Sequence, residues 1–360
     1  MKNWRIWLFP FSILYGIAVV IRNLLYNVRI LKSQRFSVPV ISVGNLTVGG
    51  SGKTPMIEYI IKLISSEYRT ATLSRGYGRK TSGFILVSET SNAAMIGDEP
   101  MLYHSKYKNV LVSIGEKRKE AITKLLSLVP KPQVILMDDA YQHRSVKPGL
   151  NILLLEFETI FKNKFLLPAG NFRELFLSKS RADVIIVTKC PASLDDNNRR
   201  KALRKINSSY RQLVWFSYMK YDEIKSFSLY QHGREEKSAP KFTKETRILL
   251  LTGIANPIPL KMYTERAFTL VRLLRYADHY DFSETDVKRV RKIFNNIVGE
   301  EKIILTTEKD AMRLMKANLI PLLEELPVYV IPIKVHFLQK DSENAAKTIL
   351  EYVRKNSTDR

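Results

Sequence analysis

Residues 43–55 read VGNLTVGGSGKTP, and their types and order are suited to holding a phosphate group. Three glycines, Gly49, Gly50 and Gly52, precede Lys53 and Thr54. Glycines let backbone N–H groups converge on an anion without obstruction by a Cβ, and a helix that begins after them adds its dipole. In such a loop the lysine reaches the terminal phosphates of a nucleotide, and the threonine hydroxyl binds Mg²⁺.

The loop departs from the strict phosphate-loop pattern at one position, because Thr47 stands where the pattern has glycine. Pro55 is tolerated, since the first turn of a helix has no use for its N–H. A glycine turn with an incidental Lys-Thr pair is the alternative, but the expected strand before and helix after the loop favour the phosphate site. The residues expected to bind the nucleotide are Thr47, Val48, Gly49, Gly50, Ser51, Gly52, Lys53 and Thr54.

A second feature supports a nucleotide. The apolar stretch QVILMDDA (133–140) predicts a strand that ends in Asp138 and Asp139, where an acid can hold the metal ion of a nucleotide. On its own, a pair of aspartates after a strand is typical of a turn or a helix cap. Together with the glycine loop, it predicts a nucleoside-triphosphate site with Mg²⁺ at Thr54, Asp138 and Asp139.

The sequence disfavours a guanine nucleotide. VTKCP (187–191) begins like a guanine-recognition motif, but Pro191 stands where that motif needs aspartate. In TTEKD (306–310), Lys309 is adjacent to Asp310, which is the wrong spacing. An ATP-dependent transferase or an ATPase remains.

A kinase also needs an acceptor for the proton of the attacking hydroxyl. Asp98 in IGDEP (96–100) is one candidate, although the same residues are equally typical of a turn and a helix cap. In ADHYDFS (277–283), His279 lies among acids and could tune a catalytic carboxylate, whereas solvated loop histidines are commoner. The residues alone leave these alternatives open.

The elements that must position these residues follow an α/β rhythm. Continuous Val/Ile/Leu runs predict strands buried on both faces, and hence a parallel sheet covered by helices. Amphipathic helical patterns, such as residues 54–68, separate several of the runs. The runs lie at 38–43, 70–74, 109–113, 133–138, 151–156 and 183–188.

The pattern changes after about residue 207. Residues 212–231 predict an extended, partly exposed hairpin, and a polar stretch follows at 232–246. The α/β rhythm then resumes, which predicts a second α/β domain joined through a short β linker. Its apolar runs lie at 247–253, 268–274, 302–307 and 328–333.

The formal net charge of +23 in 360 residues predicts anionic partners. The first carboxylate is Glu58, after a run of basic residues. Nucleic-acid binding lacks support, since no recognised module or aromatic-basic motif is present. The single cysteine, Cys190, excludes an internal disulfide and suits a reducing compartment.

The N-terminal segment between Arg5 and Arg22 carries no charge over 16 residues, which is short of the ~20 needed to cross a bilayer comfortably. We expect a membrane-embedded or interfacial helix, with Trp4, Trp7 and Tyr15 near the headgroups and basic residues on acidic lipid. A buried core helix is the alternative, and a cleaved signal peptide is disfavoured because no small-residue cleavage site follows. The excess of cations after the segment predicts that the rest of the chain is cytoplasmic.

Nine blocks in order now resemble one family, the tetraacyldisaccharide 4'-kinases, or lipid A 4'-kinases. The resemblance runs from the basic apolar N-terminus to about residue 335. It includes Thr47, because a Thr or Ser at this position of the loop is usual in the family. Two departures are Ala140-Tyr141, where Gly-Phe is usual, and Tyr280, where a second histidine is common. The blocks are GNLTVGGSGKTP, SRGYGR (74–79), GDEP, DDAYQHR (138–144), LLPAGNFRE (166–174), VTKCP, LTGIANP (251–257), ADHYDF and TTEKDAMRL (306–314).

The resemblance implies an activity and a location. ATP would donate its γ-phosphoryl group to the 4'-hydroxyl of a tetraacyl glucosamine disaccharide 1-phosphate, giving lipid IVA in lipid A (lipopolysaccharide) biosynthesis. The implied partners are this acylated phospholipid and the acidic surface of the bacterial inner membrane, at its cytoplasmic face, with the enzyme as a monomer. A membrane-associated P-loop ATPase or nucleotide switch without a lipid acceptor is the rival hypothesis.

The implied fold is a P-loop NTPase-like α/β/α sandwich with a second, smaller α/β/α domain, a β-hairpin linker and an N-terminal membrane-associated helix. The expected boundaries are 1–36 for the helix, 37–210 for the kinase domain, 211–245 for the linker and 246–360 for the second domain.

The resemblance also implies roles. Asp98 is the expected catalytic base and His279 supports its charge, while Lys53 and Thr54 bind phosphates and Mg²⁺. Asp138 and Asp139 organise the metal or the transferring phosphoryl group. Weaker candidates on the substrate side are Arg75, Arg79, Gln142, His143, Asn171 and Arg173, with plain surface cations as the alternative for the first two. Thr252 and Asn256 are expected to shape a strand–helix turn.

Overall fold

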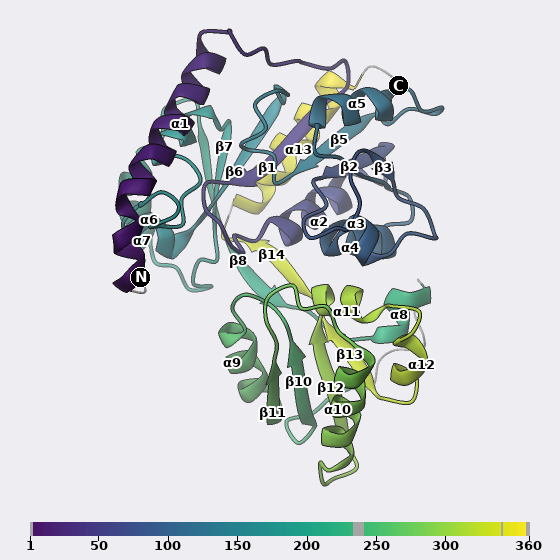
Figure 1. Ribbon diagram of the computed structural model, residues 1–360. Helices are drawn as coiled ribbons and strands as arrows, with labels where there is room; N and C mark the ends of the chain where they lie inside the picture. Colours follow the sequence, from purple (N-terminus) through teal and green to yellow (C-terminus); the bar gives the residue numbers. More distant parts are fainter. Residues whose placement is uncertain (1–2, 233–240, 340, 358–360) are drawn as a thin grey trace. The chain divides into compact units, whose positions relative to one another are not determined.

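The computed structural model describes residues 3–232, 241–339 and 341–357. The chain forms two compact units (Figure 1). Unit 1 consists of Met1–Arg75, Asn109–Lys220 and Lys334–Arg360, and unit 2 consists of Gly76–Lys108 and Tyr221–Ile333. Both units are α/β, which confirms the expected fold class.

The division differs from the expected boundaries in two segments. Residues 76–108 belong to unit 2, where Leu102 joins the same apolar core as Phe227 and Leu249. Residues 334–360 return to unit 1, where the C-terminal helix α13 (Asp341–Asn356) packs beside α2 (Lys53–Ile64). Hydrophobic periodicity predicts each element but not the core that the element joins, so contiguous boundaries could not capture these exchanges.

The large sheet of unit 1 is mostly parallel, with β1 between β5 and β6. Every residue of β1, β2, β5 and β7 is buried, as continuous apolar runs predict. Within unit 1 the strand order is β14 (Ile333–Phe337), β8 (Leu213–Tyr221), β7 (Val184–Thr188), β6 (Leu150–Glu156), β1 (Val40–Asn45), β5 (Val134–Asp138), β2 (Thr70–Ser74) and β4 (Leu111–Ile114).

Helices pack on this sheet through apolar faces. The side chains of Ile57, Ile60 and Ile61 on α2 are fully buried, and α2 packs on β1 and β5. Ile160 and Ile206, from two further helices, join the core under β6 and β7. The remaining helical elements of unit 1 are η1 (Asn3–Leu8), α1 (Phe9–Asn27), α5 (Arg118–Leu126), α6 (Phe157–Phe161), η2 (Phe176–Arg181) and α7 (Asp196–Ile206).

The strand order reverses at β1, because the strand that follows β1 in the chain lies on one side and β6 lies on the other. Ligands of open α/β sheets bind beyond the carboxyl ends of the strands at such a switch point. The glycine loop follows β1, and at the same edge Asp138 ends β5 and Asp139 comes directly after it. The fold therefore brings the two predicted nucleotide motifs together.

Unit 2 has a smaller sheet in which β10, β11, β12 and β13 are parallel and β9 is antiparallel. Leu249 and Leu251 of β10 belong to one core, whereas Ile248 and Leu250 belong to another, so helices or loops cover both faces. The order is β11 (Thr269–Arg275), β10 (Arg247–Thr252), β12 (Lys302–Thr307), β13 (Val328–Ile331) and β9 (Lys225–Ser226). The other elements are β3 (Ile85–Leu86), α3 (Ala93–Ile96), α4 (Asp98–Lys106), α8 (Phe227–His232), α9 (Ile258–Ala267), α10 (Glu284–Asn295), α11 (Glu308–Leu314) and α12 (Ile320–Leu323).

The predicted local hairpin at 212–231 is wrong. Strand β8 pairs in parallel with β7, β9 pairs with β13, and α8 follows at once. The neighbour of β8 on its other side is β14, which lies more than a hundred residues later in the chain. The chain therefore leaves unit 1 along β8 and returns along β14. Most of the predicted polar stretch lies outside the described residues, at 233–240.

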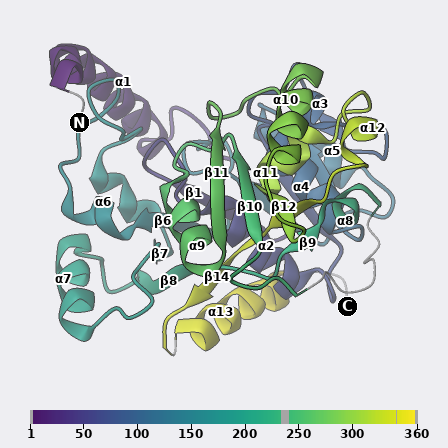
Figure 2. The same ribbon diagram turned by 90° about the horizontal axis from the view of Figure 1, so that it is seen from below.

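The N-terminal helix α1 lies along the outside of unit 1 (Figures 1 and 2). Among the described residues it is the one helix that is long and apolar enough to cross a membrane, and only 11% of its apolar window is buried. That low burial contradicts the alternative of a buried core helix.

Candidate active site

The backbone of the glycine loop takes a conformation that requires glycine at two positions. Gly49 has φ 108° and Gly52 has φ 87°, in the left-handed region that other residues rarely adopt. A Cβ on Gly52 would also lie 2.2 Å from Cε of Met219. At Gly49 and Gly50, in contrast, an added Cβ would meet no described atom within 4 Å. The tip of the loop is therefore open, as a phosphate site requires.

Two buried polar groups beside the loop have no partner within the described parts of the chain. Ser51 is 3% exposed and Asn45 is fully buried, yet Oγ of Ser51 and Nδ2 of Asn45 make no hydrogen bond. Buried polar groups without partners cost free energy, so such groups at an open loop fit a ligand with hydrogen-bonding atoms. The Thr188 hydroxyl meanwhile donates to the Ser51 carbonyl at 2.9 Å and fixes the loop from β7.

Lys53 belongs to a charged cluster at the edge of the sheet. Its Nζ lies 3.4 Å from Oδ1 of Asn45 and 3.6 Å from Oδ1 of Asp139. Arg173 donates to both oxygens of the same aspartate, at 3.0 and 2.9 Å. Burial alone would raise the pKa of Asp139, but Lys53 and Arg173 outweigh it and lower that pKa. Two cations thus converge on Asp139 beside the glycine loop.

Asp138 is the last residue of β5 and is 5% exposed. The backbone around it is fixed by Arg118, which is 1% exposed. The Arg118 guanidinium donates to the carbonyls of Ser74, Gly115 and Asp138, and so joins the ends of β2, β4 and β5. Burial lowers the pKa of Arg118 to about 10, which still leaves it charged at neutral pH. Sequence reasoning missed this residue, because a lone arginine at a helix start carries no motif.

The residues fit a magnesium ion without forming a dedicated metal cage. No group of three or more His, Cys, Asp or Glu side chains within the described ranges could hold a metal. Mg²⁺ is commonly bound through one or two carboxylates plus substrate phosphates and water. The expected set of Thr54, Asp138 and Asp139 matches that chemistry, since Thr54 lies at the start of α2 and the two aspartates at the end of β5.

The weaker substrate-side candidates separate into groups. Gln142 joins the Lys53 cluster, because its amide donates to the Asn45 carbonyl at 2.9 Å and its Oε1 accepts from Arg173 at 3.5 Å. Asn171 accepts a hydrogen bond from Arg5 at 2.9 Å, so the N-terminal segment holds it.

Two further candidates have distinct surroundings. Burial, together with Arg118 and Arg75, lowers the pKa of His143 to about 4, so this imidazole is neutral at physiological pH. Arg75 itself is exposed in unit 1, whereas Arg79 belongs to unit 2 and donates to the Gly83 carbonyl at 2.7 Å.

Unit 2 contains a separate acid–base cluster around Asp98. This residue opens α4, directly after Gly97 with its φ of 94°. Its Oδ2 accepts hydrogen bonds from Nδ1 of His279 at 3.0 Å and from Nε and Nη2 of Arg313 at 2.8 and 2.6 Å. No side-chain capping hydrogen bond forms at this helix start. The structure therefore contradicts the alternative in which Asp98 is merely a helix cap.

The charges of this cluster stabilise one another. Burial would raise the pKa of Asp98, but hydrogen bonds from His279 and Arg313 lower it further than burial raises it. The hydrogen bond to Asp98 raises the pKa of His279 in turn, and the ring of Tyr77 lies 5.2 Å from the imidazole. Each partner therefore favours the charged form of the other, a carboxylate beside an imidazolium.

Arg313, on α11, is the residue of this cluster that sequence reasoning missed. It is 5% exposed, and its Nη1 donates to the Gly253 carbonyl at 2.8 Å and to Oδ1 of Asp310 at 2.9 Å. The available signal was an arginine surrounded by the apolar residues of the stretch AMRL, three positions after an aspartate. An arginine at such a position is buried only when paired.

Of the two residues expected to shape a turn near this cluster, Thr252 and Asn256, one does so. Asn256 accepts from the backbone N–H of Ile258 at the start of α9, which confirms its turn-shaping role. Thr252 instead donates to Oδ2 of Asp310 at 3.1 Å. Tyr280, at the position where the family commonly has a second histidine, points its hydroxyl to Asp286 at 3.3 Å. His279 is thus the residue of this loop that contacts Asp98.

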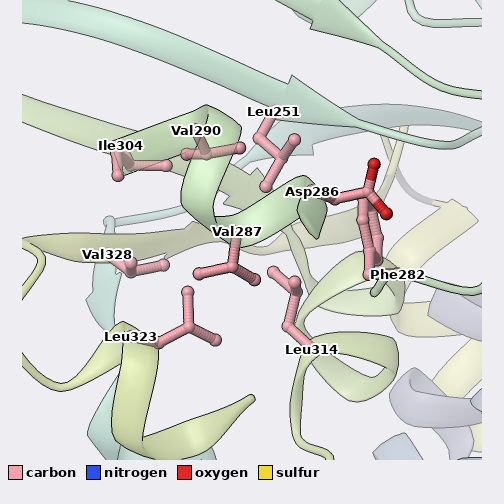
Figure 3. A pocket seen from close by; sticks show the side chains of 9 residues that line it. All are labelled: Leu251, Phe282, Asp286, Val287, Val290, Ile304, Leu314, Leu323 and Val328. Carbon is pink, nitrogen blue, oxygen red and sulfur yellow. The ribbon is translucent and has the colours of Figure 1, made fainter. Parts of the chain in front are cut away.

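A small void in unit 2 has a different character (Figure 3). Its lining is apolar except for Asp286, which caps α10, and its volume of about 10 Å³ holds no more than one water molecule. The lining residues are Leu251, Phe282, Asp286, Val287, Val290, Ile304, Leu314, Leu323 and Val328. The void is a packing defect of the core rather than a ligand site.

Comparison with known proteins decides the family. The family described as tetraacyldisaccharide-1-P 4'-kinase matches residues 4–354. The chain belongs to this family. The tetraacyldisaccharide 4'-kinase of Flavobacterium johnsoniae is 43% identical, covering 97% of both chains. That of Bacteroides thetaiotaomicron is 40% identical, covering 98% of this chain and 94% of its own.

A solved structure extends the match to three dimensions. LpxK of Aquifex aeolicus, crystallised as an "apo" form in complex with ATP, gives a TM-score of 0.74 at 29% identity. The match covers 97% of this chain and 99% of the other. The family resemblance, the kinase class and the α/β fold expected from the sequence are thereby confirmed. This tetraacyldisaccharide-1-phosphate 4'-kinase family member has its glycine loop in unit 1 and its Asp98 cluster in unit 2.

Proposed function

We propose that this family member transfers the γ-phosphoryl group of ATP to the 4'-hydroxyl of a tetraacyl glucosamine disaccharide 1-phosphate, forming lipid IVA. The observation that carries the proposal is the open glycine loop with Lys53 held beside Asp139, in a chain of this family. Phosphoryl transfer asks a protein mainly for positioning and charge neutralisation, and these residues supply both.

On the nucleotide side, backbone N–H groups of the glycine loop and the N-terminus of α2 would hold the phosphates. The N–H groups of Val48 and Ser51 are not counted among them, because they donate to the carbonyls of Asn171 and Gly49. Lys53 and Arg173, both held by Asp139, would neutralise the terminal phosphate. The buried Ser51 hydroxyl and Asn45 amide would gain the partners that they lack.

Mg²⁺, when bound, supplies positive charge that neutralises the phosphates in the transition state. We propose Thr54 and Asp138 as its protein ligands. Asp139 is already neutralised by two cations and is thus the weaker ligand, so it would instead position Lys53 and Arg173. Under this proposal D138N raises the Mg²⁺ concentration needed for half-maximal rate more than D139N does.

On the acceptor side, we propose that Asp98 takes the proton of the sugar hydroxyl, and that His279 balances its charge. A carboxylate with a lowered pKa is a weak base. The transition state of phosphoryl transfer is loose, however, so the proton moves late and the main task of Asp98 is to orient the hydroxyl.

An enzyme that acts on a lipid substrate must contact the membrane that holds this lipid. Helix α1 carries an exposed apolar face that can make such a contact. The exposed apolar residues of its face include Phe11, Leu14, Ile17, Ile21 and Leu24. Such a contiguous exposed apolar surface marks an interaction site. We propose that this face lies in the acidic cytoplasmic leaflet of the bacterial inner membrane.

Contacts along η1 and α1 favour an N-terminal segment that lies on the membrane over one that spans it. Arg5 donates to the Pro168 and Gly170 carbonyls, Ser12 to the Leu166 carbonyl, Tyr15 to the Arg173 carbonyl, and Asn23 to Glu174. A spanning helix would carry the irregular backbone of the loop 165–174, with the charged Arg173 and Glu174, into hydrocarbon, where unsatisfied backbone groups and charges are costly. An in-plane orientation keeps that loop at the interface.

A lipid assay tests the proposal against its rival, an ATPase or nucleotide switch without a lipid acceptor. The purified protein is incubated with ATP, Mg²⁺ and a tetraacyl disaccharide 1-phosphate in mixed micelles, and the lipid is extracted for mass spectrometry. The kinase gives a bis-phosphorylated lipid, and the variant K53M gives none. ATP consumption with unchanged lipid would support the rival.

A further inference from the structure

We propose that Arg313 is a positioning residue for phosphoryl transfer: it anchors one carboxylate oxygen of Asp98 and thereby presents the other to the sugar hydroxyl. This inference rests on the proposed role of Asp98 as proton acceptor. It adds a residue to which neither the sequence nor the resemblance had assigned a role.

Within the described ranges, the hydrogen bonds that the Asp98 side chain accepts all end on one of its two carboxylate oxygens. Its Oδ2 accepts three hydrogen bonds, two from Arg313 and one from His279, whereas Oδ1 accepts none from the residues that the structure describes. Three donors on one oxygen hold the carboxylate in place, and the two from Arg313 are charge-assisted and short. The remaining oxygen can accept the hydroxyl hydrogen of a substrate.

Arg313 can serve as an anchor because it is itself fixed. Its Nη1 donates to the Gly253 carbonyl and to Oδ1 of Asp310, which is fully buried. Oδ2 of Asp310 in turn accepts from Thr252, from the Gly253 N–H and from Thr307. The position of Asp98 is thus defined by the carboxyl ends of β10 and β12, which are buried strands.

A lysine could not make these contacts. The planar guanidinium directs Nε and Nη2 to Asp98 while Nη1 donates to the Gly253 carbonyl and to Asp310. An ammonium group is a compact point charge without this fixed planar arrangement of donors. The geometry therefore uses the shape of arginine as well as its charge.

The charges that face Asp98 come from each element packed against it. Arg313 on α11 and His279 after β11 lower its pKa. Glu99, the next residue on α4, is paired with Lys309. Asp278 lies 4.0 Å from Nε2 of His279, and Asp310 pairs with Arg313. Arg313 is the permanent cation of the set, since a guanidinium keeps its proton at any relevant pH.

The proton balance of the step is simple. As the sugar oxygen forms its bond to phosphorus, the bond between that phosphorus and the leaving oxygen of ADP breaks. The O–H bond of the sugar breaks as well, and its proton passes to Oδ1 of Asp98 and later to solvent. Arg313 exchanges no proton; it keeps Asp98 ionised and aligned before the step.

The first test compares pH profiles of R313M and R313K with that of the unmodified full-length protein, using lipid product as readout. Removal of the cation raises the pKa of Asp98, so the acid limb of kcat/KM moves to higher pH by about one unit in R313M. In R313K the acid limb of kcat/KM returns to the pH found in the unmodified protein, because lysine keeps the positive charge. Its kcat nevertheless stays at least about tenfold lower than in the unmodified protein, because the planar set of guanidinium donors is lost. KM for ATP changes little in either variant.

Equal losses in both variants with an unshifted acid limb would overturn the inference and assign Arg313 a purely structural role. A second measurement needs no destabilising variant. In the unmodified protein, the Nε–H resonance of Arg313, assigned by its absence in R313K, should shift at acid pH with the midpoint of the acid limb. If the chemical shift of this resonance does not change over the pH range of the acid limb, the inference is also overturned.

The variant D98A separates this inference from the proposal beneath it. Near-normal turnover in D98A removes Asp98 as the acceptor and the role of Arg313 with it. An inactive D98A together with a wild-type pH profile in R313M leaves Asp98 in place and refutes the inference on Arg313 alone.

Discussion

At the scale of single residues, the Asp98–His279 pair shows how surroundings decide the role of a carboxylate. A buried carboxylate without partners would be protonated more readily, but here two cationic donors keep it charged. His279 has a positive φ of 57°, in the left-handed region, and this loop conformation brings its Nδ1 to Asp98. Sequence reasoning found both residues but could not decide whether Asp98 caps a helix, because that depends on the direction of its side chain.

The first prediction concerns catalysis by Asp98. D98A should abolish lipid phosphorylation, because the hydroxyl loses both its orienting group and its proton acceptor, whereas ATP binding should be retained. Calorimetry with a nonhydrolysable ATP analogue checks binding, and the lipid assay checks transfer. The isosteric D98N serves as the control for packing and should be almost as inactive.

The second prediction is a pH-dependent stabilisation by His279. Its pKa is raised above 6.5 in the folded protein, so its contribution to stability is fully present below that value and is lost as pH rises through the raised pKa. H279Q should therefore lower Tm relative to the unmodified protein at about pH 5.5 but not at about pH 9. Scanning calorimetry at both pH values measures the difference in Tm between H279Q and the unmodified protein. A loss of Tm that is larger at the higher pH than at the lower pH would refute the ion pair.

At the scale of elements, the strands could be predicted from the sequence and their partners could not. The stretches at 70–74 and 302–307 match β2 and β12 at both ends, because continuous apolar runs mark buried strands directly. The pairing of β8 with β14 and the roles of Arg118 and Arg313 depend on chain segments far apart in sequence. No local pattern encodes such contacts.

The third prediction concerns the glycine loop. G52A should lower the Tm of the ligand-free protein by a few degrees, since a positive φ in a residue with a Cβ costs on the order of 1 kcal/mol. Contact with Cε of Met219 adds little, because that side chain end is flexible. G50A is the matched control: its Cβ meets no described atom within 4 Å, and its Tm should stay unchanged.

At the scale of the whole molecule, the proposed docking on a membrane involves both the net positive charge and the exposed helix α1. In the proposed docking, the net charge of +23 would attract the chain to acidic lipid, and α1 would offer apolar side chains to the acyl region. The sequence predicted this helix from its composition. The proposed in-plane orientation rests on the contacts of the N-terminal helices with the loop 165–174, which a sequence does not display.

The fourth prediction tests that orientation. Ile17 and Ile21 are 51% and 52% exposed, so their replacement by glutamate disturbs no core but places charge in the lipid. I17E/I21E should reduce binding to vesicles of acidic phospholipid at least about tenfold while ATP binding is unchanged. V129E, at a residue 97% exposed elsewhere in unit 1, is the control and should bind vesicles normally. Deletion of residues 1–36 should likewise weaken membrane association more than nucleotide binding.

The position of the new phosphate tests the central claim most directly. The protein is incubated with ATP carrying a labelled γ-phosphate and with a tetraacyl disaccharide 1-phosphate, and the lipid product is fragmented in a mass spectrometer. We predict that the label appears on the distal glucosamine at its 4'-oxygen, and that K53M and D98A give no labelled lipid. Label found only in inorganic phosphate, with the lipid unchanged, would contradict the account.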